Sequence, residues 1–150
     1  MTDAPRLDGI HHLKLPVSDL QRSLTWYQDR LGYLVMHEFI EDGALMGIAM
    51  THPNGGPDLA IRLDPERARV AAGFDYFAIG VPGQHAIEAL AARFTERDDA
   101  HDGVHRTPVG WVLTGVHDPD SHEVRFYTVP LELPVDFADA DAANHRIGTP

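Results

Sequence analysis

The sequence predicts an α+β fold built from two pseudo-symmetric βαβββ modules. Short segments alternate in hydrophobicity as half-buried strands do, and each half of the chain has one amphipathic helical segment after its first strand. The order of segments repeats after about 64 residues, because residues 73–81 align with residues 9–17. A repeat of this length is typical of an internal duplication of one supersecondary unit.

The first module is expected to open with a strand over residues 10–17. Its apolar side chains fall on one face, and His12 and Lys14 share the opposite face. By the same parity, His11 is expected to pack toward the helix layer. A helix is predicted next, over residues 19–31. Ser18 and Gln21 have the spacing of a capping box at its start, and Gly32 supplies the left-handed residue that commonly ends a helix.

Three more strands complete the first module, and the second module repeats the order less clearly. The first-module strands are expected over residues 33–40, 45–51 and 59–63, with turn-forming sequences between them. The second module has predicted strands over residues 73–81, 105–108, 111–116 and 123–129, with a helix after Pro82 and Gly83. His117 and His122 flank the last turn and are expected in a solvated loop.

These elements divide the chain into four parts. We predict an N-terminal extension over residues 1–7, a first module over 8–66, a second module over 67–129 and an acidic, proline-containing tail over 130–150. The tail has no sustained periodicity, so it is either a poorly ordered terminus or an arm that lies across a partner subunit.

Composition excludes several classes of function. The chain has 12 Lys+Arg against 23 Asp+Glu and a net charge of −11, so it lacks the basic surface that nucleic acids require. It contains no cysteine, which excludes disulfides and thiolate chemistry. No apolar stretch approaches the ~20 residues that cross a bilayer, so we expect no membrane partner and a cytoplasmic location. Lys14 is the single lysine.

Four sequence motifs resemble the vicinal oxygen chelate superfamily, which includes glyoxalase I, extradiol dioxygenases, fosfomycin resistance enzymes and bleomycin-binding proteins. The motifs are IHHLKLPVSDL at residues 10–20, SLTWY at 23–27, LG at 31–32 and DPDSHEVRFY at 118–127. The resemblance covers about residues 8–128. It implies that the two sheets curl into an incomplete β-barrel around a cleft, commonly completed by dimerisation, so a homodimer is expected.

The resemblance also identifies four positions where metal-binding members carry His, Glu or Gln. These positions hold His12, Arg62, Tyr76 and Arg125 in this chain, so only one usual ligand remains. A catalytic ion typically needs three protein ligands, and a guanidinium repels a cation. We therefore expect no metal cofactor. A divalent Fe, Mn, Ni or Zn ion held by rearranged ligands is kept as the alternative.

If the resemblance sets the strand register, the cleft is cationic. Its expected binding residues are Lys14, Arg62, Arg125 and Tyr127, with Trp111 as an apolar wall and with His12 and Tyr76 as catalytic groups. Such a cleft favours a small anionic, aromatic or carbonyl-containing ligand. Carboxylates such as Glu38 or Glu123 are expected to offset buried arginines. Each of these side chains could instead be structural, with the histidine merely hydrogen-bonded and the arginines paired with surface acids.

Four functions therefore stay open. The chain could sequester a small molecule without a metal, or catalyse metal-free acid–base chemistry of a lyase or isomerase type through His12 and Tyr76. The alternative is a metal-dependent extradiol dioxygenase or a glyoxalase/lyase-type enzyme with rearranged ligands. A structural or regulatory dimer is the fourth reading, because one sequence does not show that the cleft is used.

Overall fold

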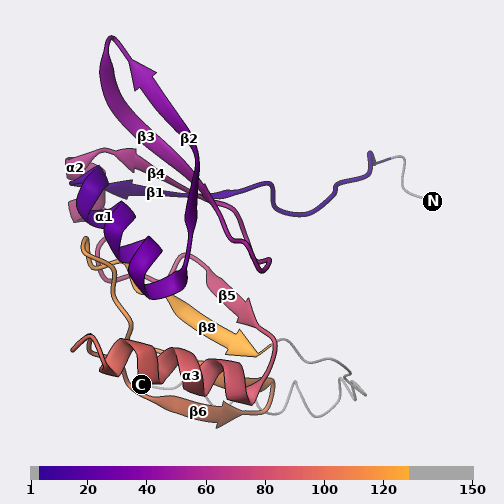
Figure 1. The fold of residues 1–150 in the computed structure, drawn as a ribbon. Coiled ribbons are helices and arrows are strands. Elements are labelled where there is room, and N and C mark those ends of the chain that lie inside the picture. Colours follow the sequence, from indigo (N-terminus) through magenta and orange to yellow (C-terminus); the bar gives the residue numbers. More distant parts are fainter. Residues whose placement is uncertain (1–3, 129–150) are drawn as a thin grey trace, which may run out of the picture. The chain divides into compact units, whose positions relative to one another are not determined.

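The computed structural model describes residues 4–128 of the chain, which form two compact units. Within the described residues, the first unit contains residues 4–76 together with His117–Glu123, and the second contains Phe77–Val116 and residues 124–128. Each unit holds one four-stranded mixed sheet with helices (Figure 1), so the predicted α+β class is confirmed. The predicted tail over residues 130–150 lies outside the described residues.

The first sheet has the strand order β1-β4-β3-β2. Strands β1 and β4 are parallel, and the other neighbours are antiparallel. The elements of this unit are β1 (Leu13–Val17), α1 (Leu20–Trp26), the π-helical segment η1 (Tyr27–Leu31), β2 (Leu34–Glu41), β3 (Ala44–Thr51), β4 (Leu59–Leu63) and α2 (Pro65–Ala71). The predicted βαβββ order of the first half is therefore present, with α2 as an addition.

The two faces of the first sheet differ in chemistry. Leu15 and Val17 of β1 are buried, as are Ile61 of β4 and Ile48 of β3, and helix α1 contacts β3 and β4. Lys14 lies between the half-buried Leu13 and the buried Leu15 on β1 but is itself exposed, because successive side chains of a strand point to opposite faces. The helix-covered face thus forms the core, and the other face is free to build a pocket.

The start of helix α1 differs from the expected capping box. Asp19 is the N-cap, and its carboxylate accepts a hydrogen bond of 2.9 Å from the backbone N–H of Arg22. Ser18 lies one residue too early to cap, and its hydroxyl donates to Asp120 instead, at 2.5 Å. The expected end of the helical region at Gly32 is confirmed, with a φ of +81°.

Helix α2 was not predicted, although its signal is present in the sequence. Asp64 caps it by accepting from the backbone N–H of Arg67, and Pro65 takes the first helical position, where its missing N–H costs no hydrogen bond. None of the helices in residues 4–128 is long and apolar enough to span a membrane.

The second unit repeats the topology of the first. Its elements are β5 (Ala78–Val81), α3 (Gln84–Thr95), β6 (Val104–Thr107), β7 (Gly110–Leu113) and β8 (Arg125–Thr128), and its strand order is β5-β8-β7-β6. Phe94 of α3 packs on Phe126 of β8 with ring centroids 5.9 Å apart, and both side chains are buried. The helix-on-sheet core expected from the repeat is present.

A short segment from late in the sequence belongs to the first unit. Residues 117–123, here called the clasp, hold a buried Asp118 whose two oxygens are both used. One oxygen accepts from the backbone N–H groups of Asp120 and His122, each at 3.0 Å, and the other accepts from the Tyr27 hydroxyl at 2.9 Å. Burial raises the pKa of Asp118, and His122 and these hydrogen bonds partly offset the increase.

His122 is buried within the clasp, so the expected solvated loop is wrong for this residue. The residue is 1% exposed, and Nε2 lies 2.7 Å from the carbonyl oxygen of Pro16. Because a carbonyl only accepts, Nε2 must carry the proton. Among the described residues, Nδ1 of His122 has no hydrogen-bond partner. Together with the bond from Ser18 to Asp120, this contact fixes the end of β1.

Candidate functional site

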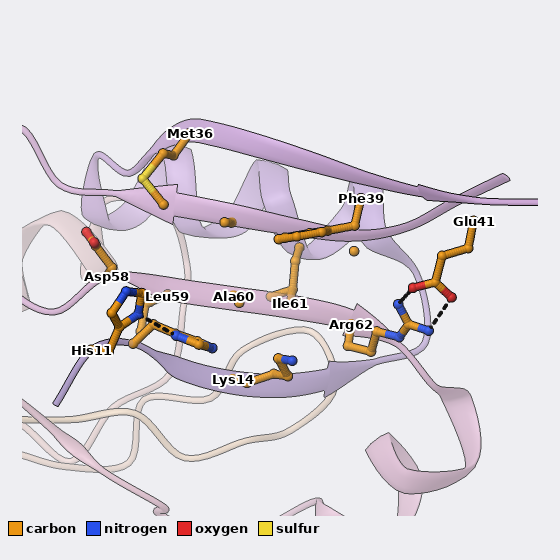
Figure 2. A pocket seen from close by; sticks show the side chains of 13 residues that line it. His11, Lys14, Met36, Phe39, Glu41, Asp58, Leu59, Ala60, Ile61 and Arg62 are labelled. Atoms are coloured by element: carbon orange, nitrogen blue, oxygen red, sulfur yellow. Dashed lines mark hydrogen bonds and ion pairs between the residues drawn. The ribbon is translucent and has the colours of Figure 1, made fainter. Parts of the chain in front are cut away.

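A cavity of about 400 Å³ opens on the face of the first sheet opposite helix α1 (Figure 2). All four strands of the sheet contribute to it, together with the two histidines that precede β1. A volume of this size suits a small organic molecule.

Small side chains on the two central strands make room for this cavity. Ala49 of β3 pairs with Ala60 of β4, and Gly47 of β3 pairs with Arg62 of β4. A side chain at Gly47 would place its Cβ only 3.2 Å from the carbonyl oxygen of Ile61 and 3.5 Å from the Phe39 ring. The floor of the pocket is therefore apolar, and its small side chains leave the space above the two strands open.

Strand β2 provides one wall of the pocket. Met36, Phe39 and Glu41 all line it, although simple alternation would not place residues 36, 39 and 41 on one face. The register shift between Val35 and His37 leaves Met36 without a partner on β3, and such an irregularity resets which face a side chain takes. The wall is apolar in its centre and acidic at the end of the strand.

Arg62 lines the pocket as an ion pair with Glu41, at one end of the site (Figure 2). The contact is bidentate: Nη2 donates to Oε2 at 2.8 Å, and Nη1 donates to Oε1. The hydrogen bond from Arg62 lowers the pKa of Glu41, and the same bond raises the pKa of Arg62. The partner expected from the sequence was Glu38 or Glu123. Glu41 takes this role because it lies two residues after Phe39 on β2 and lines the pocket with it.

Lys14 lies on β1 between the two ends of the pocket, as Figure 2 shows. Within residues 4–128 its ammonium group has no hydrogen bond or ion pair. On the neighbouring strand Lys14 pairs with Ala60 of the apolar floor. Lys14 is therefore the cation that is available to an anionic group of a ligand.

Two imidazoles and a carboxylate lie at the other end of the pocket. Nδ1 of His11 is 2.9 Å from Nδ1 of His12, so one ring donates and the other accepts. The expectation that His11 packs toward the helix layer is wrong, because β1 begins only at Leu13 and strand parity does not extend to residue 11. Asp58 lines the same end, above His11 in Figure 2.

The structure does not bring the other predicted site residues into this pocket. Tyr76 belongs to the first unit but is 54% exposed, with ring centroids 4.9 Å from Phe74 and 6.3 Å from His122. Trp111 on β7 and both Arg125 and Tyr127 on β8 belong to the second unit. Their roles in a site therefore stay predictions.

The pocket does not offer the donor set of a metal centre of the family type. In the described part of the chain, no group of three or more His, Asp or Glu side chains is arranged to hold a metal ion. His12 contributes one imidazole nitrogen, but a guanidinium stands at the position of the usual carboxylate on β4.

The fold and the pocket place the chain in a class of α+β proteins that have two similar modules and a pocket of ligand size on one mixed sheet. A family model described as the Glyoxalase/Bleomycin resistance protein/Dioxygenase superfamily matches residues 9–126. The chain belongs to this superfamily, and the expected relationship is confirmed. No curated protein sequence matches the chain.

Solved structures agree with this fold. A lactoylglutathione lyase from Agrobacterium tumefaciens is 17% identical, with a TM-score of 0.66 and coverage of 83% of this chain and 96% of that one. TnmS3, an antibiotic binding protein from Streptomyces sp. CB03234, is 17% identical, with a TM-score of 0.68 and coverage of 85% and 100%. The fosfomycin resistance protein FosX from Listeria monocytogenes is 12% identical, with a TM-score of 0.64 and coverage of 84% and 97%.

Sequence reasoning missed several lining residues. Met36 was hidden by the irregular register of β2, and His11 by its place before the strand. The sequence did contain one signal for the pocket floor. Gly47 and Ala49 on β3 and Ala60 on β4 are small residues in strands that otherwise carry large apolar side chains.

Proposed function

We propose that this protein binds a small molecule with an anionic or carbonyl oxygen in the pocket of its first unit, without a metal ion. Binding would serve either sequestration or metal-free acid–base catalysis. The observation that carries the proposal is the unpaired Lys14 ammonium beside an apolar floor. The ligand's apolar body would cover the floor, and its charged oxygen would meet Lys14.

The imidazole pair offers the acid–base part of this proposal. His11 and His12 share one hydrogen bond between their Nδ1 atoms, so the pair holds both a proton donor and an acceptor at one end of the pocket. Either ring could take a proton from a carbon next to a carbonyl or return one. Sequestration needs no such transfer, and turnover of a carbonyl compound would distinguish the two outcomes.

The binding test uses benzoate, a small apolar body with one carboxylate. In a ligand-observed NMR titration, Lys14→Met is expected to weaken benzoate binding about tenfold, because a hydrogen bond to a charged group contributes about 1.5 kcal/mol or more. Arg69→Met removes the same charge from the exposed face of α2 and should leave binding unchanged. Equal binding by wild type and Lys14→Met would contradict the proposal.

The same titration tests the metal-dependent alternative. The side-by-side Nδ1 atoms of His11 and His12 are the observation that favours this alternative, since imidazole is a common ligand of divalent ions. We expect protein treated with a chelator to bind benzoate as untreated protein does. Loss of binding after chelation, with recovery on adding Zn²⁺, Fe²⁺, Mn²⁺ or Ni²⁺, would instead support a metal enzyme of the dioxygenase or glyoxalase/lyase type.

We also propose that the protein forms a homodimer through β2. This strand lies at the edge of its sheet, and Leu34, Met36 and Ile40 are 52%, 54% and 58% exposed. Exposed edge strands with apolar side chains pair readily with another chain. Sedimentation velocity should show a dimer for wild type and a monomer for Ile40→Lys, with Val70→Lys on α2 as the control. A monomeric wild type would exclude the dimer.

A further inference from the structure

We propose that Glu41 sets the charge of the ligand by occupying Arg62, so that the pocket selects monoanions over dianions. This inference rests on the proposed function and deepens it. The sequence analysis expected Arg62 and Arg125 to bind the anionic ligand. In this inference Arg62 is instead neutralised by Glu41 and does not bind the ligand.

The first step is the state of the two cations in the pocket. Both oxygens of Glu41 are engaged by the guanidinium of Arg62, in the planar bidentate geometry that suits this pair. Lys14 has no such partner within the described residues. One positive charge is therefore available to a ligand, and the other is already neutralised.

The second step is the position of the acids around Lys14. Figure 2 shows Glu41 beyond Arg62 at one end of the pocket and Asp58 beside His11 at the other, with Lys14 between them. A ligand that places one carboxylate on Lys14 would carry a second carboxylate toward one of these acids. Like charges at close range repel, so the second anionic group weakens binding.

The third step is how strongly Glu41 holds Arg62. The Arg62 side chain is 37% exposed and the Glu41 side chain is 52% exposed, so solvent and salt screen the pair. Exposed ion pairs are weak, so we expect the pair to change ligand affinity by at most about fivefold. Glu41 is therefore a moderate but measurable determinant of specificity, and its removal should not disturb the sheet.

The test compares benzoate with terephthalate, which has the same ring and a second carboxylate. Wild type is expected to bind benzoate more tightly. In Glu41→Gln, Arg62 becomes available, and the ratio of the terephthalate to the benzoate dissociation constant should fall by about twofold to fivefold. Glu38→Gln is the matched control, because it removes the same charge from the same strand at an exposed residue outside the pocket. It should leave the ratio unchanged.

Three outcomes would overturn this inference. They are an unchanged ratio in Glu41→Gln, an equal fall of the ratio in Glu38→Gln, and wild type that binds terephthalate as tightly as benzoate. In each case benzoate binding that still depends on Lys14 would leave the proposed function intact. If wild type binds neither compound, the proposed function fails as well. A salt titration adds a second readout, since the advantage of Glu41→Gln should shrink as ionic strength rises.

Discussion

Replacing Asp118 with alanine is expected to lower the free energy of unfolding by about 3 kcal/mol. The change leaves the Tyr27 hydroxyl and the backbone N–H groups of Asp120 and His122 without their acceptor in a buried place. Urea denaturation would measure the loss. The exposed Glu38→Ala on β2 is the control, and it should change stability by less than about 0.5 kcal/mol.

The pH dependence of the same pair of proteins gives a second check. Burial raises the pKa of Asp118 above its ordinary value of 3.8, so the folded state disfavours the ionised carboxylate. Its contribution to stability is complete below pH 3.8 and declines as pH rises through the raised pKa. The advantage of wild type over Asp118→Ala should therefore be smaller at pH 7 than at pH 4. An advantage that grows with pH, or a loss under about 1 kcal/mol, would contradict this account of the clasp.

Filling the pocket from its floor is expected to remove ligand binding altogether. Ala60→Phe would place an aromatic ring where the pocket now lies, because Ala60 and its pairing partner Ala49 form the floor between Lys14 and Phe39. Benzoate affinity should fall more than tenfold, because the ligand would lose its hydrogen bond to the charged Lys14 together with its contacts to the floor. Ligand-observed NMR would measure the affinity.

A control must show that Ala60→Phe remains folded. The new ring points into an existing cavity, so the thermal midpoint of Ala60→Phe should stay close to that of wild type. Ala72→Phe adds the same ring at an exposed residue outside the pocket, and this variant should bind benzoate as wild type does. Unchanged benzoate binding by a folded Ala60→Phe protein would place the ligand elsewhere on the molecule.

Features that depend on local chemistry were predictable from the sequence. The turn between β2 and β3 has Asp42 and Gly43 at φ values of +49° and +78°, as an Asp-Gly hairpin requires. Gly32 ends the first helical region for the same conformational reason. The repeated βαβββ order followed from alternation and periodicity, because both describe how a segment buries one face.

Features that depend on interruptions of regular structure were not predictable. Glu38 and Glu123 were named as the acids that would offset the arginines, whereas Glu41 pairs with Arg62 and a register shift between Val35 and His37 interrupts the alternation of β2. His11 was assigned to the wrong face because the strand had not yet begun at that residue. The burial of His122 depends on the carbonyl of Pro16, a partner more than a hundred residues away along the chain that no local pattern encodes.

The clasp also constrains how this chain can fold during synthesis. Tyr27 and Ser18 leave the ribosome early, but the residues that satisfy their hydroxyl groups, Asp118 and Asp120, emerge some ninety to a hundred residues later. Until then the first sheet lacks the partner that anchors the end of β1. Although the sequence repeats about its midpoint, a cut there would leave the first unit without residues 117–123 and their hydrogen bonds.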